Sequence, residues 1–225
     1  MPLKKTRTKT LSGVKKTETF LPILLLTFLL WIFYRSIFHF PVWFDESIGK
    51  LIFFALPSLG YVAISHDTRI LATFAFKKMK SGLLMGLAIG GLFGFVAALL
   101  GSLSRNGQVE FVPYYLADWF WLELFLALLT GFWETLFFFS FVMQAIEEKF
   151  SAWSLQKQIF TVALIFLLFH LPNILLRFDM QSVFLQILLL FTFALGQALL
   201  FYRQRNAYLL LMVQAIWGMA LLIHF

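Results

Sequence analysis

The sequence predicts an all-α, polytopic membrane protein, and three observations carry this prediction. Of the 225 residues, 61% are hydrophobic and 13% are charged, with a mean hydropathy of +0.86, whereas a soluble domain carries about 25% charged residues. The apolar residues form runs that approach the roughly 20 residues needed to cross a bilayer. Basic residues gather in short segments between these runs, which is typical of membrane topology.

Seven apolar runs are candidate transmembrane helices. The fourth contains "LLTG" at residues 128–131, so it is either one tilted helix or two helices, which would give eight spans. The fifth is short for a span. The runs are Phe20–Phe38, Ile48–Ile64, Ser81–Leu103, Phe120–Ile146, Ile159–Leu171, Ser182–Tyr202 and Ala207–His224.

The chain divides into a basic tail and one membrane domain. Residues 1–19 are polar and basic, and the run after them lacks a clear small-residue cleavage site. We therefore expect an uncleaved cytosolic tail, with a signal peptide as the alternative. Residues 20–225 form a single transmembrane domain, so the protein acts in or at the bilayer.

The basic residues predict the orientation of the chain. With a cytosolic amino terminus, 14 of the 18 lysines and arginines lie inside, as the positive-inside rule requires. Seven spans then place the carboxyl terminus outside, in a multi-pass protein of the cell membrane. The inside set is Lys4, Lys5, Arg7, Lys9, Lys15, Lys16, Arg69, Lys77, Lys78, Lys80, Lys149, Lys157, Arg203 and Arg205, and the outside set is Arg35, Lys50, Arg105 and Arg177.

Charge and cysteine content exclude several functions. The net charge of +7 follows membrane topology, so we expect the bilayer and a membrane-associated peptide or protein as partners, and no nucleic acid. Without cysteine there is no disulfide, no CxxC zinc site and no thiol nucleophile. The third run carries glycines every four residues, which predicts a helix-packing face. They are Gly82, Gly86, Gly90 and Gly94.

Polar residues at membrane depth are few, and each is an expensive group to place there. Glu123 and Glu134 are eleven residues apart, which puts them on one helix face but about 16 Å apart, too far to share a proton. We expect Glu123 to lie at the interface, in contact with water. The other members, which hydrogen bonding between helices would also explain, are Gln144, His170, Gln197 and Gln214.

The known chemistries of intramembrane proteases narrow the choice. The chain has no HExxH motif, no GxSG element within a run and no pair of intramembrane aspartates. Only a glutamate and histidine constellation is left, with Glu134 and His170 as its members.

These residues resemble the CPBP intramembrane metalloproteases, which include CAAX prenyl endopeptidases and bacterial abortive-infection and bacteriocin-immunity relatives. "ETLFFFSFV", from residue 134, is similar to the family's EExxxRG motif, and "FLLFH", ending at His170, is similar to its FxxxH motif. The stretch "FALGQALLFYRQRNAYLLLMVQAIWGMALL" has the outline of the third motif. The resemblance implies an α-helical core at about residues 118–225.

The motifs are also degenerate. Thr135 stands where the family has its second glutamate, and Phe139 and Ser140 stand where it has arginine and glycine. Gln214 and Gly218 stand at the histidine and asparagine positions of the third motif. Among the motifs' polar positions, Glu134 and His170 are retained.

The resemblance implies a zinc site, and the chain supplies it incompletely. A catalytic zinc takes about three protein ligands and a water molecule. His170 and Glu134 would be ligands, with Gln214 as an unusual third, and Glu134 would also have to serve as the base. We predict that Gln214 meets His170 only if helices are tilted or broken, or if the spans begin and end at other residues, because the two lie toward opposite ends of their predicted spans.

Two functions follow. The first is a CAAX-type endopeptidase that uses Zn²⁺ and cuts membrane-associated peptides. The second, which ligand counting favours, is a pseudoprotease without a cofactor that acts in binding, scaffolding or immunity. A proton or ion path through Glu134 and His170 is a third possibility.

Overall fold

The computed structural model describes residues 11–106, 118–177 and 180–224, and every regular element within them is a helix. The elements are α1 (Leu11–Ile37), α2 (Val42–Phe44), η1 (Asp45–Gly49), η2 (Leu51–Ala55), α3 (Leu56–Ser65), α4 (Arg69–Ala72), η3 (Phe76–Lys78), α5 (Met79–Asn106), α6 (Phe120–Glu134), η5 (Thr135–Met143), α7 (Gln144–Lys149), α8 (Leu155–Arg177), α9 (Met180–Gln204) and α10 (Ala207–His224). Helix α1 thus begins within the stretch predicted as a tail.

The protein is a multi-pass membrane protein. Among the described residues, six helices are long and apolar enough to cross a bilayer, and the apolar segment Ala207–Met219 is shorter. The fourth span runs without a break over Phe120–Lys149, so of the two alternatives for this run the structure has one helix and not two. The fifth span is not short either, because α8 continues through Pro172 to Arg177 despite the hydrogen bond that proline removes.

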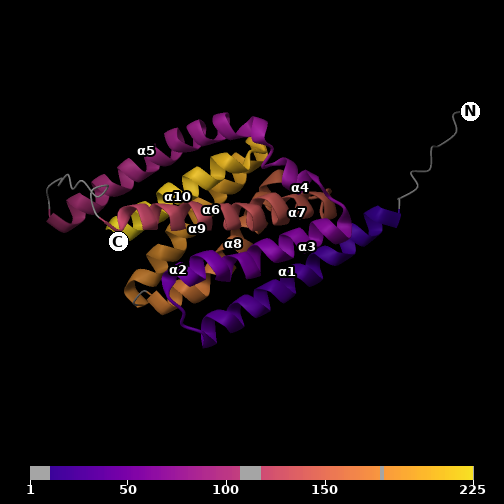
Figure 1. The fold of residues 1–225 in the computed structure, drawn as a ribbon, viewed down its shortest axis with the longest axis horizontal. Coiled ribbons are helices and arrows are strands. Elements are labelled where there is room, and N and C mark those ends of the chain that lie inside the picture. Colours follow the sequence, from indigo (N-terminus) through magenta and orange to yellow (C-terminus); the bar gives the residue numbers. More distant parts are fainter. Residues whose placement is uncertain (1–10, 107–117, 178–179, 225) are drawn as a thin grey trace, which may run out of the picture.

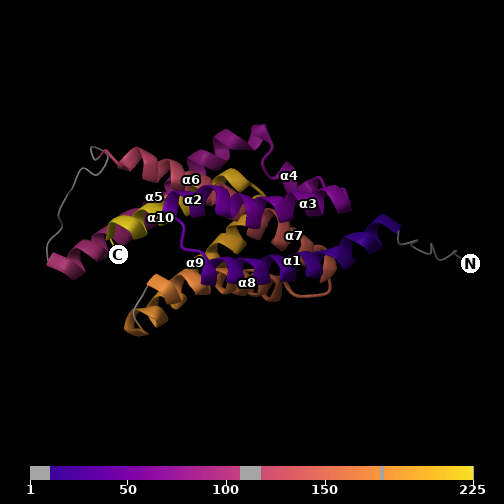
Figure 2. The ribbon, with the colours of Figure 1, turned by 60° about the horizontal axis from the view of Figure 1, so that its bottom comes forward.

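The helix made of α6, η5 and α7 lies at the centre of the bundle. It is 67% buried, against 17–33% for the other spans. Figures 1 and 2 show α1 beside α3 on one side of it and α5 along α10 on another. Helices α8 and α9 pack together and complete the enclosure.

Glycines let α10 come close to two neighbours. A Cβ atom at Gly86 of α5 would lie 2.6 Å from the Leu209 carbonyl oxygen, and one at Gly131 of α6 would lie 2.8 Å from that of Leu211. No larger residue fits without moving the α10 backbone. The glycine spacing in α5 therefore forms the packing face that the sequence predicted.

Three segments of the described chain are π-helical. Segment η5 contains nine residues that are all buried, four of them phenylalanines, and η1 and η2 stand on either side of Lys50. A π-helix has hydrogen bonds from i to i+5 and therefore differs from the spacing of an α-helix. The α-helical spacing of the central helix therefore holds as far as Glu134, changes over η5 and resumes in α7.

Candidate functional site

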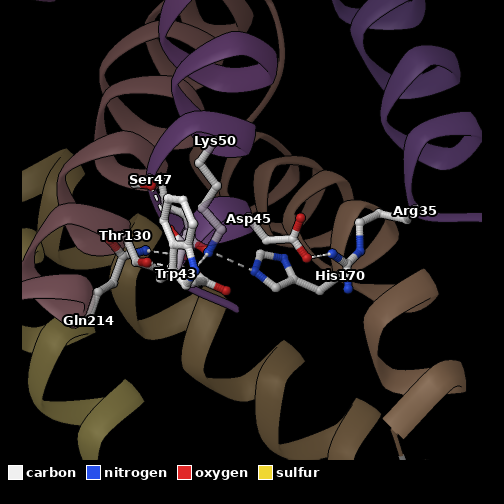
Figure 3. A network of polar contacts seen from close by, with 10 residues as sticks. Arg35, Trp43, Asp45, Ser47, Lys50, Thr130, His170 and Gln214 are labelled. Carbon is white, nitrogen blue, oxygen red and sulfur yellow. Dashed lines mark hydrogen bonds and ion pairs between the residues drawn. The ribbon is translucent and has the colours of Figure 1, made fainter. Parts of the chain in front are cut away.

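Glu134 lies where α6 meets η5, is 6% exposed and is the centre of a polar network. Its Oε1 lies 2.6 Å from Lys50 Nζ and 3.4 Å from His170 Nε2. Its Oε2 lies 3.5 Å from Gln214 Nε2. The structure thus brings together the three residues that the sequence singled out, and Figure 3 shows the labelled His170 and Gln214 on either side of Lys50.

Contacts of Thr73 fix the position of α10 along the central helix, so that Gln214 of α10 lies level with Glu134 of α6. The Thr73 carbonyl accepts a hydrogen bond from the Ala207 N–H at 3.1 Å, and the Thr73 hydroxyl lies 2.8 Å from that of Ser140. Helix α10 therefore starts beside Ser140, well before the end of α7. Ser140 follows Glu134 by six residues and Ala207 precedes Gln214 by seven, so Glu134 and Gln214 lie a similar number of residues from this contact.

Lys50 is the site residue that sequence reasoning missed. The sequence counted it only as one of four outside charges near the start of the second run, whereas the second span covers Val42–Ser65 and Lys50 is 5% exposed within it. Its ammonium bonds both Glu134 and Glu46, the latter at 2.5 Å. The i,i+4 spacing of Glu46 and Lys50 is typical of an ion pair on a helix and was the available signal.

A second charged cluster holds the start of this span in place. The Tyr34 hydroxyl and the Arg35 guanidinium, both on α1, donate hydrogen bonds to the Asp45 carboxylate. Asp45 directly precedes Glu46, which also accepts a hydrogen bond from the Thr130 hydroxyl of α6. The network therefore joins α1, the second span and the central helix.

His170 is oriented by its own helix. Its Nδ1 lies 2.8 Å from the Phe166 carbonyl oxygen, and the ring stacks on that of Phe166 at 4.2 Å. An N–H donated to this carbonyl leaves Nε2 as the atom that faces Glu134. This is the orientation that histidines at metal and catalytic sites usually have.

A cavity of about 380 Å³ adjoins the network. One of its walls is a stripe of α6 that begins at Glu123 and ends at Glu134, so the two carboxylates share a helix face, as their spacing predicted. The remaining lining residues on other elements are Val42, Glu46, Lys50, Phe166, His170, Asn173, Ile174, Gln186, Leu189, Leu190, Phe193, Gln214, Trp217 and Gly218. Within the described structure, Asn173 Oδ1 and Trp217 Nε1 have no hydrogen-bond partner.

Residues 116–220 match the model of a family described as "Type II CAAX prenyl endopeptidase Rce1-like". The predicted family resemblance is confirmed. The chain is therefore a CAAX-endopeptidase-like membrane protein. The matched residues contain Glu134, His170 and Gln214, whereas Glu46 and Lys50 lie outside them. The comparison with curated proteins found no match, and neither did the comparison with solved structures.

In this CAAX-endopeptidase-like chain, the residues that depart from the motifs have partners of their own. The Thr135 hydroxyl donates to Gln214 Oε1 at 2.7 Å, so the amide turns its nitrogen toward Glu134. Phe139 is completely buried and packs on Phe166 and Phe201. In the described part of the chain, no three residues of His, Cys, Asp or Glu are grouped so that they could hold a metal.

The other predicted polar residues lie apart from this network. Gln144 donates to the Ser140 carbonyl at 2.8 Å and reaches the Arg69 carbonyl at 3.5 Å. Gln197 is 2% exposed, and its Oε1 has no hydrogen-bond partner among the described residues. Neither residue lines the cavity.

Proposed function

We propose that this CAAX-endopeptidase-like protein is a non-catalytic relative that binds a membrane-borne ligand in its cavity. The observation that carries the proposal is the Lys50 ammonium, which lies between the carboxylates of Glu46 and Glu134. The cation beside Glu134 therefore belongs to the chain itself. A metal ion at the same oxygen would be repelled by this charge or would have to displace it.

The donor set supports the same proposal. Catalytic zinc takes about three ligands from histidine and carboxylate side chains. Glu134 and His170 would provide two, while the Gln214 oxygen already accepts a hydrogen bond from Thr135. Zinc rarely uses an amide oxygen. The residues present do not fit a catalytic zinc, and we derive no metal-dependent step.

The cavity supports a binding role. Its volume of about 380 Å³ falls in the range of roughly 300–1,000 Å³ that is common for small-molecule sites. Its walls are mainly apolar, and a smaller number of polar groups lie among them. A membrane lipid or a segment of a membrane peptide has this combination of surfaces. Scaffolding and immunity roles would use the same cavity.

One observation favours endopeptidase activity as a second candidate. His170 points Nε2 at Glu134, as a catalytic histidine would. In this candidate Glu134 Oε2 accepts a proton from the water that attacks the peptide carbonyl carbon and passes it to the amine nitrogen as the C–N bond breaks, while His170 Nε2 accepts a hydrogen bond from the same water and orients it. The two candidates predict opposite results in a cleavage assay.

The test uses the full chain purified in detergent. Metal content and cleavage of a prenylated CAAX peptide are measured for the wild type, Glu134→Ala and His170→Ala. We expect no stoichiometric zinc and no cleavage in any of the three. Zinc, or cleavage, that is present in the wild type and lost in both variants would overturn the proposal. Proton flux in liposomes that depends on Glu134 would instead support an ion path.

We also propose that the amino terminus is cytosolic. The chain has no cysteine, so single cysteines can be introduced at Lys77 and Lys157, in two segments that the basic residues place inside. Both are expected to react with an impermeant maleimide only after the membrane is opened. Labelling of either one in intact cells would contradict this orientation.

A further inference from the structure

We propose that the cavity binds a single-tailed amphiphile with a cationic head, of the alkylammonium class. The inference rests on the proposed binding role and adds the charge of the ligand. It is drawn from the balance of ionisable groups around the cavity, from one carboxylate without a partner among the described residues, and from the apolar wall between that carboxylate and Glu134.

The ionisable lining residues carry an excess of negative charge. They comprise three carboxylates, one ammonium and one imidazole: Glu46, Glu123, Glu134, Lys50 and His170. With His170 neutral, three negative charges face one positive charge. A protonated His170 still leaves one carboxylate in excess. A cationic ligand balances this charge, and an anionic ligand would add to it.

Glu123 is the carboxylate available to a ligand. Glu46 and Glu134 share Lys50, and Glu46 also accepts a hydrogen bond from Thr130. The Glu123 side chain has no hydrogen bond or ion pair with any described residue. It is half-buried at the start of α6, where it lines the cavity. An ammonium head bound there would be both partly desolvated and paired.

The wall beyond Glu123 suits an apolar tail. Leu126 and Ala127 follow on the same face of α6, and the helix rises about 16 Å from Glu123 to Glu134. Phe193 and Trp217 also line the cavity, with their rings stacked 4.5 Å apart. Aromatic faces attract organic cations as well as alkyl chains. Head and tail therefore both find complementary surfaces.

The test compares three amphiphiles that differ in head charge. Radiolabelled dodecyltrimethylammonium, dodecanol and dodecanoate are titrated into the full chain in maltoside micelles, and retained ligand is counted. We expect saturable binding of the cation at about one per chain and at least about tenfold tighter than dodecanoate, a ratio that equals 1.4 kcal/mol. Glu123→Gln should remove most of this preference. Glu18→Gln, an exposed glutamate on α1, is the matched control and should change nothing.

The outcomes separate this inference from the role on which it rests. If dodecanol or dodecanoate binds as tightly as the cation, the charge inference is overturned while a binding role stands. If none of the three shows saturable binding, the binding role fails with it. A thermally stable Glu123→Gln that keeps the full preference for the cation would also overturn the inference.

Discussion

The two halves of the central helix differ in what covers them. From Thr135 to Met143 every residue is buried in the bundle, whereas from Glu123 to Thr130 one face of the same helix lines a cavity. Glu134 stands at the boundary. The difference shows that this chain keeps open space on one side of the motif glutamate and closes the core on the other.

The closed half contains the positions where the motif has changed. Phe139, at the family's arginine position, is part of the aromatic core, and Thr135 satisfies the Gln214 amide. The positive charge that Glu134 needs comes from Lys50 on another span. Removing one partner of a buried ion pair is much more costly than replacing the whole pair by apolar residues. We therefore expect single substitutions of Glu134 or Lys50, at this boundary, to be strongly destabilising.

Lys50→Met should be among the most destabilising single changes. It leaves the buried carboxylates of Glu46 and Glu134 without their shared ammonium, which should cost about 3–5 kcal/mol. Unfolding in detergent, followed by circular dichroism, measures the loss. Lys80→Met, at an exposed lysine, is the matched control. Equal stability of the two variants would show that the ion pair does not hold the boundary together.

The closed and open halves should respond differently to truncation. Phe138→Ala removes a ring that is 0% exposed and packs on Phe54 and Phe166, so we expect a cost of about 3–5 kcal/mol. Leu126→Ala only enlarges an existing cavity. Its cost should therefore lie near the lower limit for leucine-to-alanine changes in protein cores, about 2 kcal/mol. The same unfolding assay compares them. Similar losses of stability would show that Leu126 is packed as tightly as Phe138 and does not border open space.

The smallest effects on stability are expected from enlarging a side chain. Such changes test the same difference between the closed core and the cavity in the opposite direction. Ala163 is 0% exposed on α8, and Ala163→Leu should cost about 1–3 kcal/mol through overpacking. Ala127 lines the cavity, so Ala127→Leu should cost less than about 1 kcal/mol and should also weaken amphiphile binding. Denaturation midpoints and ligand retention provide the two readouts. A larger loss of stability for Ala127→Leu than for Ala163→Leu would show that Ala127 does not face open space.

Several features of the fold and site could be predicted from local sequence. The glycine spacing predicted the face that packs on α10, and the eleven-residue spacing predicted the shared face of Glu123 and Glu134. The motif resemblance selected Glu134 and His170, which lie 3.4 Å apart. Each of these depends on helical periodicity or on a short pattern.

The parts that failed depend on contacts between distant residues. The second run was predicted to start at Ile48, which left Asp45 and Glu46 outside it, yet Asp45 pairs with Arg35, and Lys50 pairs with a glutamate 84 positions away. The depth of Gln214 is set by the Thr73 carbonyl, which holds the first residue of α10. Hydropathy does not encode either contact. The end of the fifth span was missed because α8 tolerates Pro172.

A double-mutant cycle between Lys50 and Glu134 tests the central claim most directly. Lys50→Met, Glu134→Gln and the double variant are unfolded in detergent, once with excess zinc and once with a chelator. The account predicts a favourable coupling energy of about 2 kcal/mol or more, equal under both conditions, because the ammonium is the partner of Glu134. A coupling energy near zero, or a wild-type stability that falls when zinc is chelated, would contradict it.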